Sequence, residues 1–147
     1  YAVKAGAFRL LTCASPAYLE RRGTPQHPAE LAGHDGILFG TRPMFWTFRV
    51  DGEDMVAAPR TRILVNTAAA NLAAAVGGVG IARLFDYQLA DEIGSGALVP
   101  ILGDYGDDPR PVHIVYPRQG LLPLKVRAFI DWAAPRLRDA CSAFGGG

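Results

Sequence analysis

Short apolar runs alternate with capped helical segments along most of the chain, and this pattern predicts an α/β fold. An apolar strand is expected over residues 8–14, followed by a helix that Ser15 caps and Gly23 ends. A second short helix over 27–34 precedes a short apolar strand over 36–40. Two helices therefore separate the first two strands.

The middle of the chain combines a hairpin with a strand–helix–strand unit. Polar and apolar positions alternate over 45–50, and Asp51-Gly52 is a strong turn signal. Further strands are expected at 55–58, 62–65, 80–84, 97–102 and 112–116. The strands that flank the helix after Asn66 are expected to run parallel. A last helix begins at Pro123, and Pro135 is expected to end or kink it.

The helix after Asn66 consists largely of alanine and is the most informative segment. Asn66 is the expected N-cap, because its side-chain oxygen can accept from an N–H group of the first turn. The other N–H groups of that turn point outward at the positive end of the helix dipole, which favours a carboxylate or phosphate. Gly77 or Gly78 supplies the left-handed residue that ends the helix. Close packing alone explains such a helix as well as ligand binding does, and both interpretations stay open.

Composition narrows the possible functions. Half of the 147 residues are hydrophobic, a fifth are charged and the net charge is +1, as in ordinary globular proteins. No Lys/Arg run has the density of a nucleic-acid footprint, so this chain is not expected to bind DNA by itself. No apolar run reaches the roughly 18 residues of a membrane span. With two distant cysteines, Cys13 and Cys141, a reduced, cytoplasmic setting is expected.

Side chains that could carry catalysis are few. The glycines of 78–82 follow a helix rather than a strand, so a helix stop with tight packing fits better than a nucleotide loop. The three histidines lack ligand spacing, and neither a metal nor a bound cofactor is expected. Ser15 is explained as a helix cap and Cys13 as a packed thiol. A small hydrolase or transferase that uses Ser15 or Cys13 is the enzymatic alternative.

Thr41 and Arg42 directly follow the short apolar strand that ends at Gly40. In open α/β sheets, ligands bind outside the carboxyl ends of strands, where Thr41 could meet the helix that starts after Asn66. The polar groups there suit a small anion. An ordinary surface loop accounts for the same residues, and the pattern alone does not separate the two.

The order and the amino-acid sequences of these segments resemble those of the effector-binding domain of LysR-type transcriptional regulators. The resemblance runs from about Gly6 to Leu137 and rests on RLLTCASPAYLERRGTPQHPAELAGH, WTFRVDGED, LVNTAAANLAAAVGGVGIARL, GALVPIL, VHIVYP and LPLKVRAFIDW. It implies a fold like the type 2 periplasmic binding proteins, with two α/β subdomains joined by crossover strands. A small effector would lie between the subdomains, of which the first is incomplete in this chain.

The resemblance also implies a division of the chain. Residues 1–14 would form a crossover strand from the first subdomain, and 15–98 the second α/β subdomain. Residues 99–140 would return to the first subdomain and supply its C-terminal helix, and 141–147 would be a flexible tail. The family's winged helix-turn-helix and the opening half of the first subdomain would precede Tyr1, so DNA contact is expected only through that absent part.

By the same resemblance, seven residues would contact the effector: Thr12, Cys13, Gly40, Thr41, Asn66, Thr67 and Phe85. The family commonly has proline in place of Phe85, so the side of the effector site next to Phe85 is expected to differ here. The implied function is sensing of an organic acid or other small anion by a homo-oligomeric bacterial regulator, without catalysis. A stand-alone solute-binding protein of the same fold is the alternative.

Overall fold

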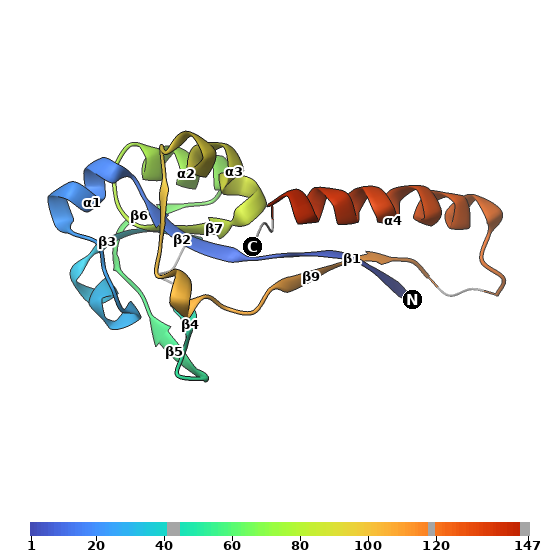
Figure 1. Ribbon diagram of the computed structural model, residues 1–147, viewed down its shortest axis with the longest axis horizontal. Coiled ribbons are helices and arrows are strands. Elements are labelled where there is room, and N and C mark those ends of the chain that lie inside the picture. Colours follow the sequence, from blue (N-terminus) through green and yellow to red (C-terminus); the bar gives the residue numbers. More distant parts are fainter. Residues whose placement is uncertain (41–44, 118–119, 145–147) are drawn as a thin grey trace. The chain divides into compact units, whose positions relative to one another are not determined.

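The computed structural model describes residues 1–40, 45–117 and 120–144, and the chain divides into two compact units (Figure 1). Unit 1 comprises Tyr1–Arg9 and Asp108–Gly147, and unit 2 comprises Leu10–Asp107. Each unit combines helix and strand, as the hydrophobic pattern predicted. The expected subdomain boundaries near residues 14 and 98 stay predictions.

Unit 2 contains most of the strands. They are β2 (Leu10–Ala14), β3 (Asp35–Phe39), β4 (Trp46–Val50), β5 (Glu53–Ala57), β6 (Arg60–Val65), β7 (Ala82–Phe85) and β8 (Val99–Ile101). β2 pairs antiparallel with both β7 and β8, while β3 and β6 pair in parallel. β4 and β5 form the expected hairpin, with Asp51 and Gly52 in its turn at φ 51° and φ 78°.

A parallel bridge joins the two groups of strands in unit 2. The Ile81 N–H donates to the Asp35 carbonyl at 2.8 Å, and the Ile37 N–H donates to the Ile81 carbonyl at 2.9 Å. The strands therefore follow one another in the order β6, β3, β7, β2, β8. β6 and β7 run in the same direction, as predicted, but they flank β3 rather than pair with each other.

The helices of unit 2 are α1 (Pro16–Arg22), the single-turn segments η1 (Pro28–Gly33) and η2 (Gly103–Tyr105), α2 (Ala68–Val76) and α3 (Asp86–Ser95). The predicted cap of α1 is confirmed, since Ser15 Oγ accepts from the Tyr18 N–H at 3.1 Å. The predicted cap of α2 is wrong. Thr67 holds that position, and its Oγ1 accepts from the Ala70 N–H at 3.1 Å.

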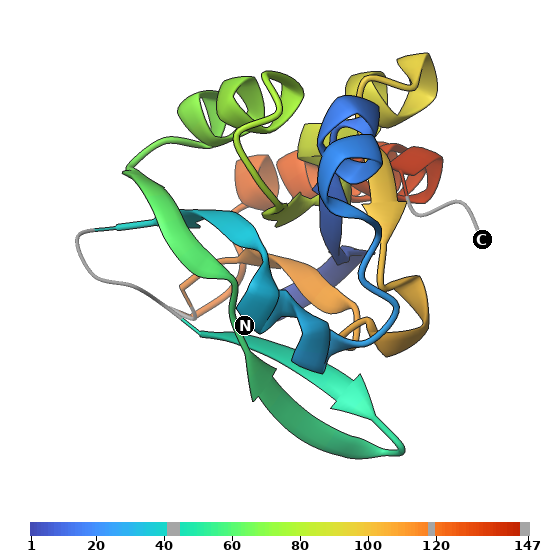
Figure 2. The same ribbon diagram turned by 90° about the vertical axis from the view of Figure 1, so that its left-hand side faces the viewer.

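Two apolar clusters cover opposite faces of the unit 2 strands. Because successive side chains of a strand alternate between faces, Cys13 belongs to one cluster and Ala14 to the other. Residues of α2 and α3 pack into the first cluster, and Phe48 of the hairpin packs into the second. Figures 1 and 2 show these helices and the hairpin on opposite sides of the strands.

Unit 1 pairs β1 (Ala2–Phe8) antiparallel with β9 (Arg110–Val115), and α4 (Leu124–Phe144) packs along β1. The helix continues through Pro135, where an end or a kink was predicted, because the Asp131 residue that loses its hydrogen bond is exposed to water. Residues 141–144, expected in a flexible tail, are helical. Cys141 is buried against Gly6, which fixes this last turn. Among the described residues, no helix is long and apolar enough to span a membrane.

Candidate ligand site

Three strands that run in the same direction end at one edge of unit 2. Val65 of β6, Phe39 of β3 and Phe85 of β7 are the last residues of their strands, and we call this the carboxyl edge. The Gly40 N–H donates to the Val65 carbonyl at 2.9 Å, which places Gly40 beside Asn66. Ligands bind at such edges in open α/β sheets. Gly40 therefore lies beside the start of α2, while the predicted approach of Thr41 to that helix start falls outside the described residues and stays a prediction.

The start of α2 lies at the carboxyl edge, immediately after β6. Thr67 Oγ1 satisfies the Ala70 N–H, and the Asn71 N–H donates to the Thr67 carbonyl at 3.1 Å. The N–H groups of Ala68 and Ala69 have no acceptor within the helix. No acidic residue lies in this first turn, so the positive end of the helix dipole is uncompensated there. The arrangement can receive a carboxylate through two backbone amides.

Phe85 lies at the carboxyl edge between β7 and α3. Its N–H donates to Gln88 Oε1 at 3.0 Å, which fixes the start of α3. The Phe85 ring stacks on Tyr87, with centroids 5.8 Å apart and planes at 11°. Leu10 of β2 pairs with Phe85 across the strands. This end of the edge thus presents a flat aromatic surface that suits the apolar body of a ligand.

Thr12 and Cys13 lie on opposite faces of β2 and are not brought together. Thr12 is paired with Arg83 of β7 and faces the hairpin side. Cys13 is fully buried in the apolar cluster beneath the helices. Burial, and then the negative charge of Glu92, raise the pKa of the Cys13 thiol to about 12. A raised pKa keeps the thiol protonated, and a protonated thiol is a poor nucleophile.

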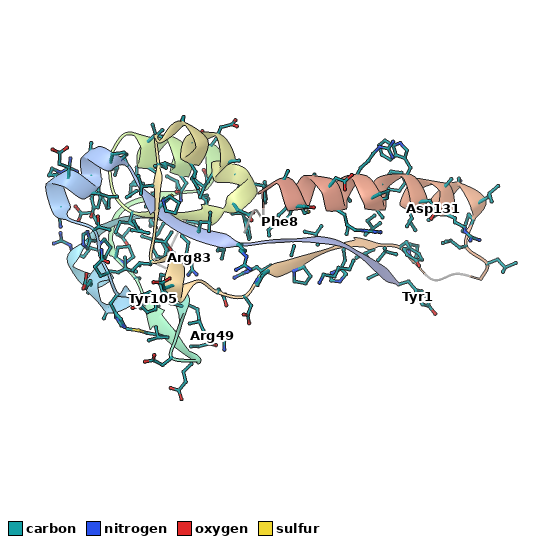
Figure 3. The ribbon with its side chains drawn as sticks, in the orientation of Figure 1. Tyr1, Phe8, Arg49, Arg83, Tyr105 and Asp131 are labelled. Atoms are coloured by element: carbon teal, nitrogen blue, oxygen red, sulfur yellow. The ribbon has the colours of Figure 1, made fainter. Side chains whose placement is uncertain are left out.

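Arg83 is a buried positive charge that the sequence interpretation missed. Its Nη2 donates to the Thr47 carbonyl at 2.8 Å, and its guanidinium lies 4.5 Å from the centre of the Phe48 ring. Figure 3 shows Arg83 between the strands and the hairpin. The available signal was a charged residue inside the otherwise apolar strand GIARLF. Arg83 adds positive potential to the face of β2 that carries Thr12.

Asn71 is a second residue that the sequence interpretation missed. It is 0% exposed, and neither polar atom of its side chain has a hydrogen-bond partner in the described part of the chain. The sequence feature that could have indicated it is a single polar residue in a run of alanines, four positions before Ala75, which is buried. Thr41, by contrast, lies outside the described residues, and its role stays a prediction.

The geometry defines a class of protein: an α/β domain of the type 2 periplasmic-binding-protein kind, with a helix start at the carboxyl edge of its strands. The chain belongs to the LysR substrate binding domain family, whose model matches residues 1–138. This confirms the resemblance seen in the sequence. It also confirms the expected two-subdomain α/β fold.

Relatives of the chain are transcriptional regulators. It is 32% identical over 128 residues to the HTH-type transcriptional activator AaeR of Escherichia coli K12, covering 86% of this chain and 41% of AaeR. It is 30% identical over 133 residues to the HTH-type transcriptional regulator CrgA of Neisseria meningitidis serogroup C, covering 88% of this chain and 44% of CrgA. These relatives favour a regulator over a stand-alone solute-binding protein.

A solved structure of the family has the same fold. The full-length virulence activator AphB of Vibrio cholerae superposes with a TM-score of 0.79 at 28% identity, covering 98% of this chain and 48% of AphB. The chain thus spans less than half the length of AaeR, CrgA and AphB.

Proposed function

We propose that this chain senses a small organic acid for a LysR-type regulator, and that the acid binds at the carboxyl edge of unit 2. Its carboxylate would accept from the Ala68 and Ala69 N–H groups, and its apolar part would contact Phe85. The observation that carries the proposal is the start of α2, where Thr67 caps the helix and two amides have no acceptor within the helix, at the point where parallel strands end.

Charge and shape both support an acid rather than a base. A helix start carries roughly half a positive charge, and hydrogen bonds from backbone amides to a carboxylate are stronger than those to neutral groups. The buried guanidinium of Arg83 adds positive potential within unit 2. The stacked rings of Phe85 and Tyr87 supply an apolar surface. Together these groups favour a compact anion with a short hydrocarbon body.

In the whole protein, ligand binding would control DNA-binding domains that lie outside this chain. A ligand shifts such an equilibrium only by binding two conformations with different affinity, so no chemical change of the ligand is needed. We also place the protein in the cytoplasm as a homo-oligomer. Exposed aromatic side chains on α4, Phe129 at 57% and Trp132 at 56%, support self-association.

Removal of one backbone donor tests the site. Proline lacks an N–H but fits the first position of a helix, and Thr67 already has the extended conformation (φ −132°, ψ 150°) that a following proline requires. Ala68→Pro should therefore keep α2 folded and weaken binding of propanoate and succinate about tenfold, as expected for a lost charge-assisted hydrogen bond. Isothermal titration calorimetry measures the change.

A pair of substitutions at Thr67 completes this test. Thr67→Ala removes the hydroxyl that fixes the first turn, and the loss of a cap of about 1 kcal/mol should weaken binding several-fold. Thr67→Ser retains the hydroxyl and should bind as the unaltered chain does. Equal affinity in all of these variants would show that the acid does not bind at the start of α2.

A further inference from the structure

Asn71 is the polar side chain of α2 that lies fully inside unit 2. Its carboxamide offers two N–H donors and one carbonyl acceptor, and all lack a partner in the described part of the chain. Buried polar groups are nearly always hydrogen-bonded, so each exception requires an explanation. Packing does not supply one, because a leucine, which branches at the same carbon and has the same number of side-chain heavy atoms, would pack there without an unpaired amide.

The direction of the Asn71 side chain connects it with the carboxyl edge. Asn71 and Ala75, one turn apart, are the buried residues of α2 and therefore face the strands. Side chains of a helix lean toward its N-terminus, so the Asn71 amide covers the first turn rather than the middle of the helix. That first turn contains the open amides of Ala68 and Ala69. From its position in α2 and the general lean of helix side chains, we expect the carboxamide to lie on the side of the helix start proposed for the ligand.

The spacing limits which ligand group can reach Asn71. Asn71 lies three positions after Ala68, which corresponds to about 4.5 Å along a helix, and the backward lean of the side chain shortens this separation. A hydroxyl on the carbon next to a carboxylate lies within a few ångströms of the carboxylate oxygens. It can also donate to the amide carbonyl and accept from the amide N–H. The surrounding residues of α2 are mainly alanines, which have no side-chain rotamers to rearrange.

We propose that Asn71 is a specificity residue for 2-hydroxy acids: the ligand carboxylate binds the start of α2, and its hydroxyl pairs with the Asn71 carboxamide. This inference rests on the proposed function and adds a substrate class to it. The unpaired amide of the free chain acquires its partner from the ligand. A simple carboxylic acid leaves that amide unpaired and binds more weakly.

Two matched pairs of acids test the proposal on the whole 147-residue chain. Propanoate and lactate differ by one hydroxyl, as do succinate and malate. Calorimetry should show each hydroxy acid binding about tenfold more tightly than its parent, the effect of one net hydrogen bond. In Asn71→Leu this ratio should fall to about one, whereas propanoate and succinate affinities stay unchanged. Gln26→Leu, an exposed amide in another part of unit 2, is the control and should keep the tenfold ratio.

The outcomes separate this inference from the function on which it rests. If the chain binds all four acids without preferring the hydroxylated ones, or if Asn71→Leu keeps the preference, the role of Asn71 is wrong and the acid site stands. If none of the acids binds, the proposed function fails and the inference fails with it. Thermal unfolding of Asn71→Leu, expected at or above the midpoint of the unaltered chain, verifies folding. Asn71→Ala provides a second variant with the same expected loss of preference.

Discussion

Gly80 lies in close contact with the backbone of β3. Its replacement should disrupt the hydrogen bonds that join the β3–β6 pair to the β7–β2–β8 strands. A Cβ atom at this position would lie 2.6 Å from the Asp35 carbonyl oxygen and 2.9 Å from the carbonyl carbon. Both atoms belong to the backbone of β3, so no side chain can rotate away. The neighbouring Ile81 makes the two hydrogen bonds, with Asp35 and Ile37, that join β3 to β7.

The expected effect of Gly80→Ala follows from these contacts. Overpacking of a rigid core costs about 1–3 kcal/mol. Displacement of Ile81 would also weaken two backbone hydrogen bonds, each with a net contribution of about 0.5–1.5 kcal/mol. The free energy of unfolding of unit 2 should therefore fall by about 2–6 kcal/mol if both hydrogen bonds are lost.

Urea denaturation followed by tryptophan fluorescence measures this change. The chain has two tryptophans, so Trp132→Phe in unit 1 leaves Trp46 of β4 as the reporter of unit 2. Gly94→Ala is the matched control in the same background. Gly94 lies inside α3 with no atom within 4 Å of an added Cβ, and alanine there should stabilise by about 0.5–1 kcal/mol. If Gly80→Ala unfolds at the same urea concentration as the parent, the close approach to β3 does not determine stability.

Two further predictions concern the Tyr18–His34 pair. Tyr18 is fully buried, and its hydroxyl accepts from the Asp35 N–H at 3.1 Å and is hydrogen-bonded to His34 Nδ1 at 2.8 Å. Tyr18→Phe should therefore lower the free energy of unfolding by about 1–3 kcal/mol in the same urea assay, and an unchanged midpoint would contradict this pairing. Burial, and then the charge of Arg22, lower the pKa of His34 below its usual 6.5, against smaller opposite effects of Glu30 and Asp35. Neutral His34 contributes to the free energy of unfolding in full above pH 6.5. This contribution is lost as the pH falls from 6.5 through the lowered pKa, so the free energy of unfolding should decrease over that range. His34→Gln should show a shallower pH dependence, and equal slopes would exclude this explanation.

Local rules predicted much of the fold because neighbouring residues decide those features. Ser15, Pro16 and Gly23 define both ends of α1 through capping and backbone conformation, and Asp51-Gly52 defines the hairpin turn. The predicted stop of α2 is similarly confirmed, since Gly78 has φ 77°. These features depend on interactions within a few residues, which a single sequence contains.

The predictions from sequence were wrong where distant or competing contacts determine the local structure. Asn66 and Thr67 are both good N-caps, and the sequence alone did not distinguish them. Pro135 was expected to end or kink α4, but the helix continues, because the exposed Asp131 carbonyl can bond to water and the last turn packs through Cys141 on Gly6, far away in sequence. Asn71 was overlooked because its importance depends on complete burial, which requires knowledge of the strands beneath α2.

Backbone groups and one buried amide, rather than a cluster of charged side chains, define the proposed site. Such a site carries no catalytic or metal-binding sequence motif, and its sequence signal is the helix that starts after residue 66. Helix amides present a fixed pair of donors to any carboxylate, so they provide affinity without distinguishing one acid from another. Discrimination must then come from side chains beside the helix start, and the roles proposed above assign this to Phe85 for the hydrocarbon part and to Asn71 for polar substituents. If these roles hold, substitution at these two positions should change which acid the chain binds without altering the fold.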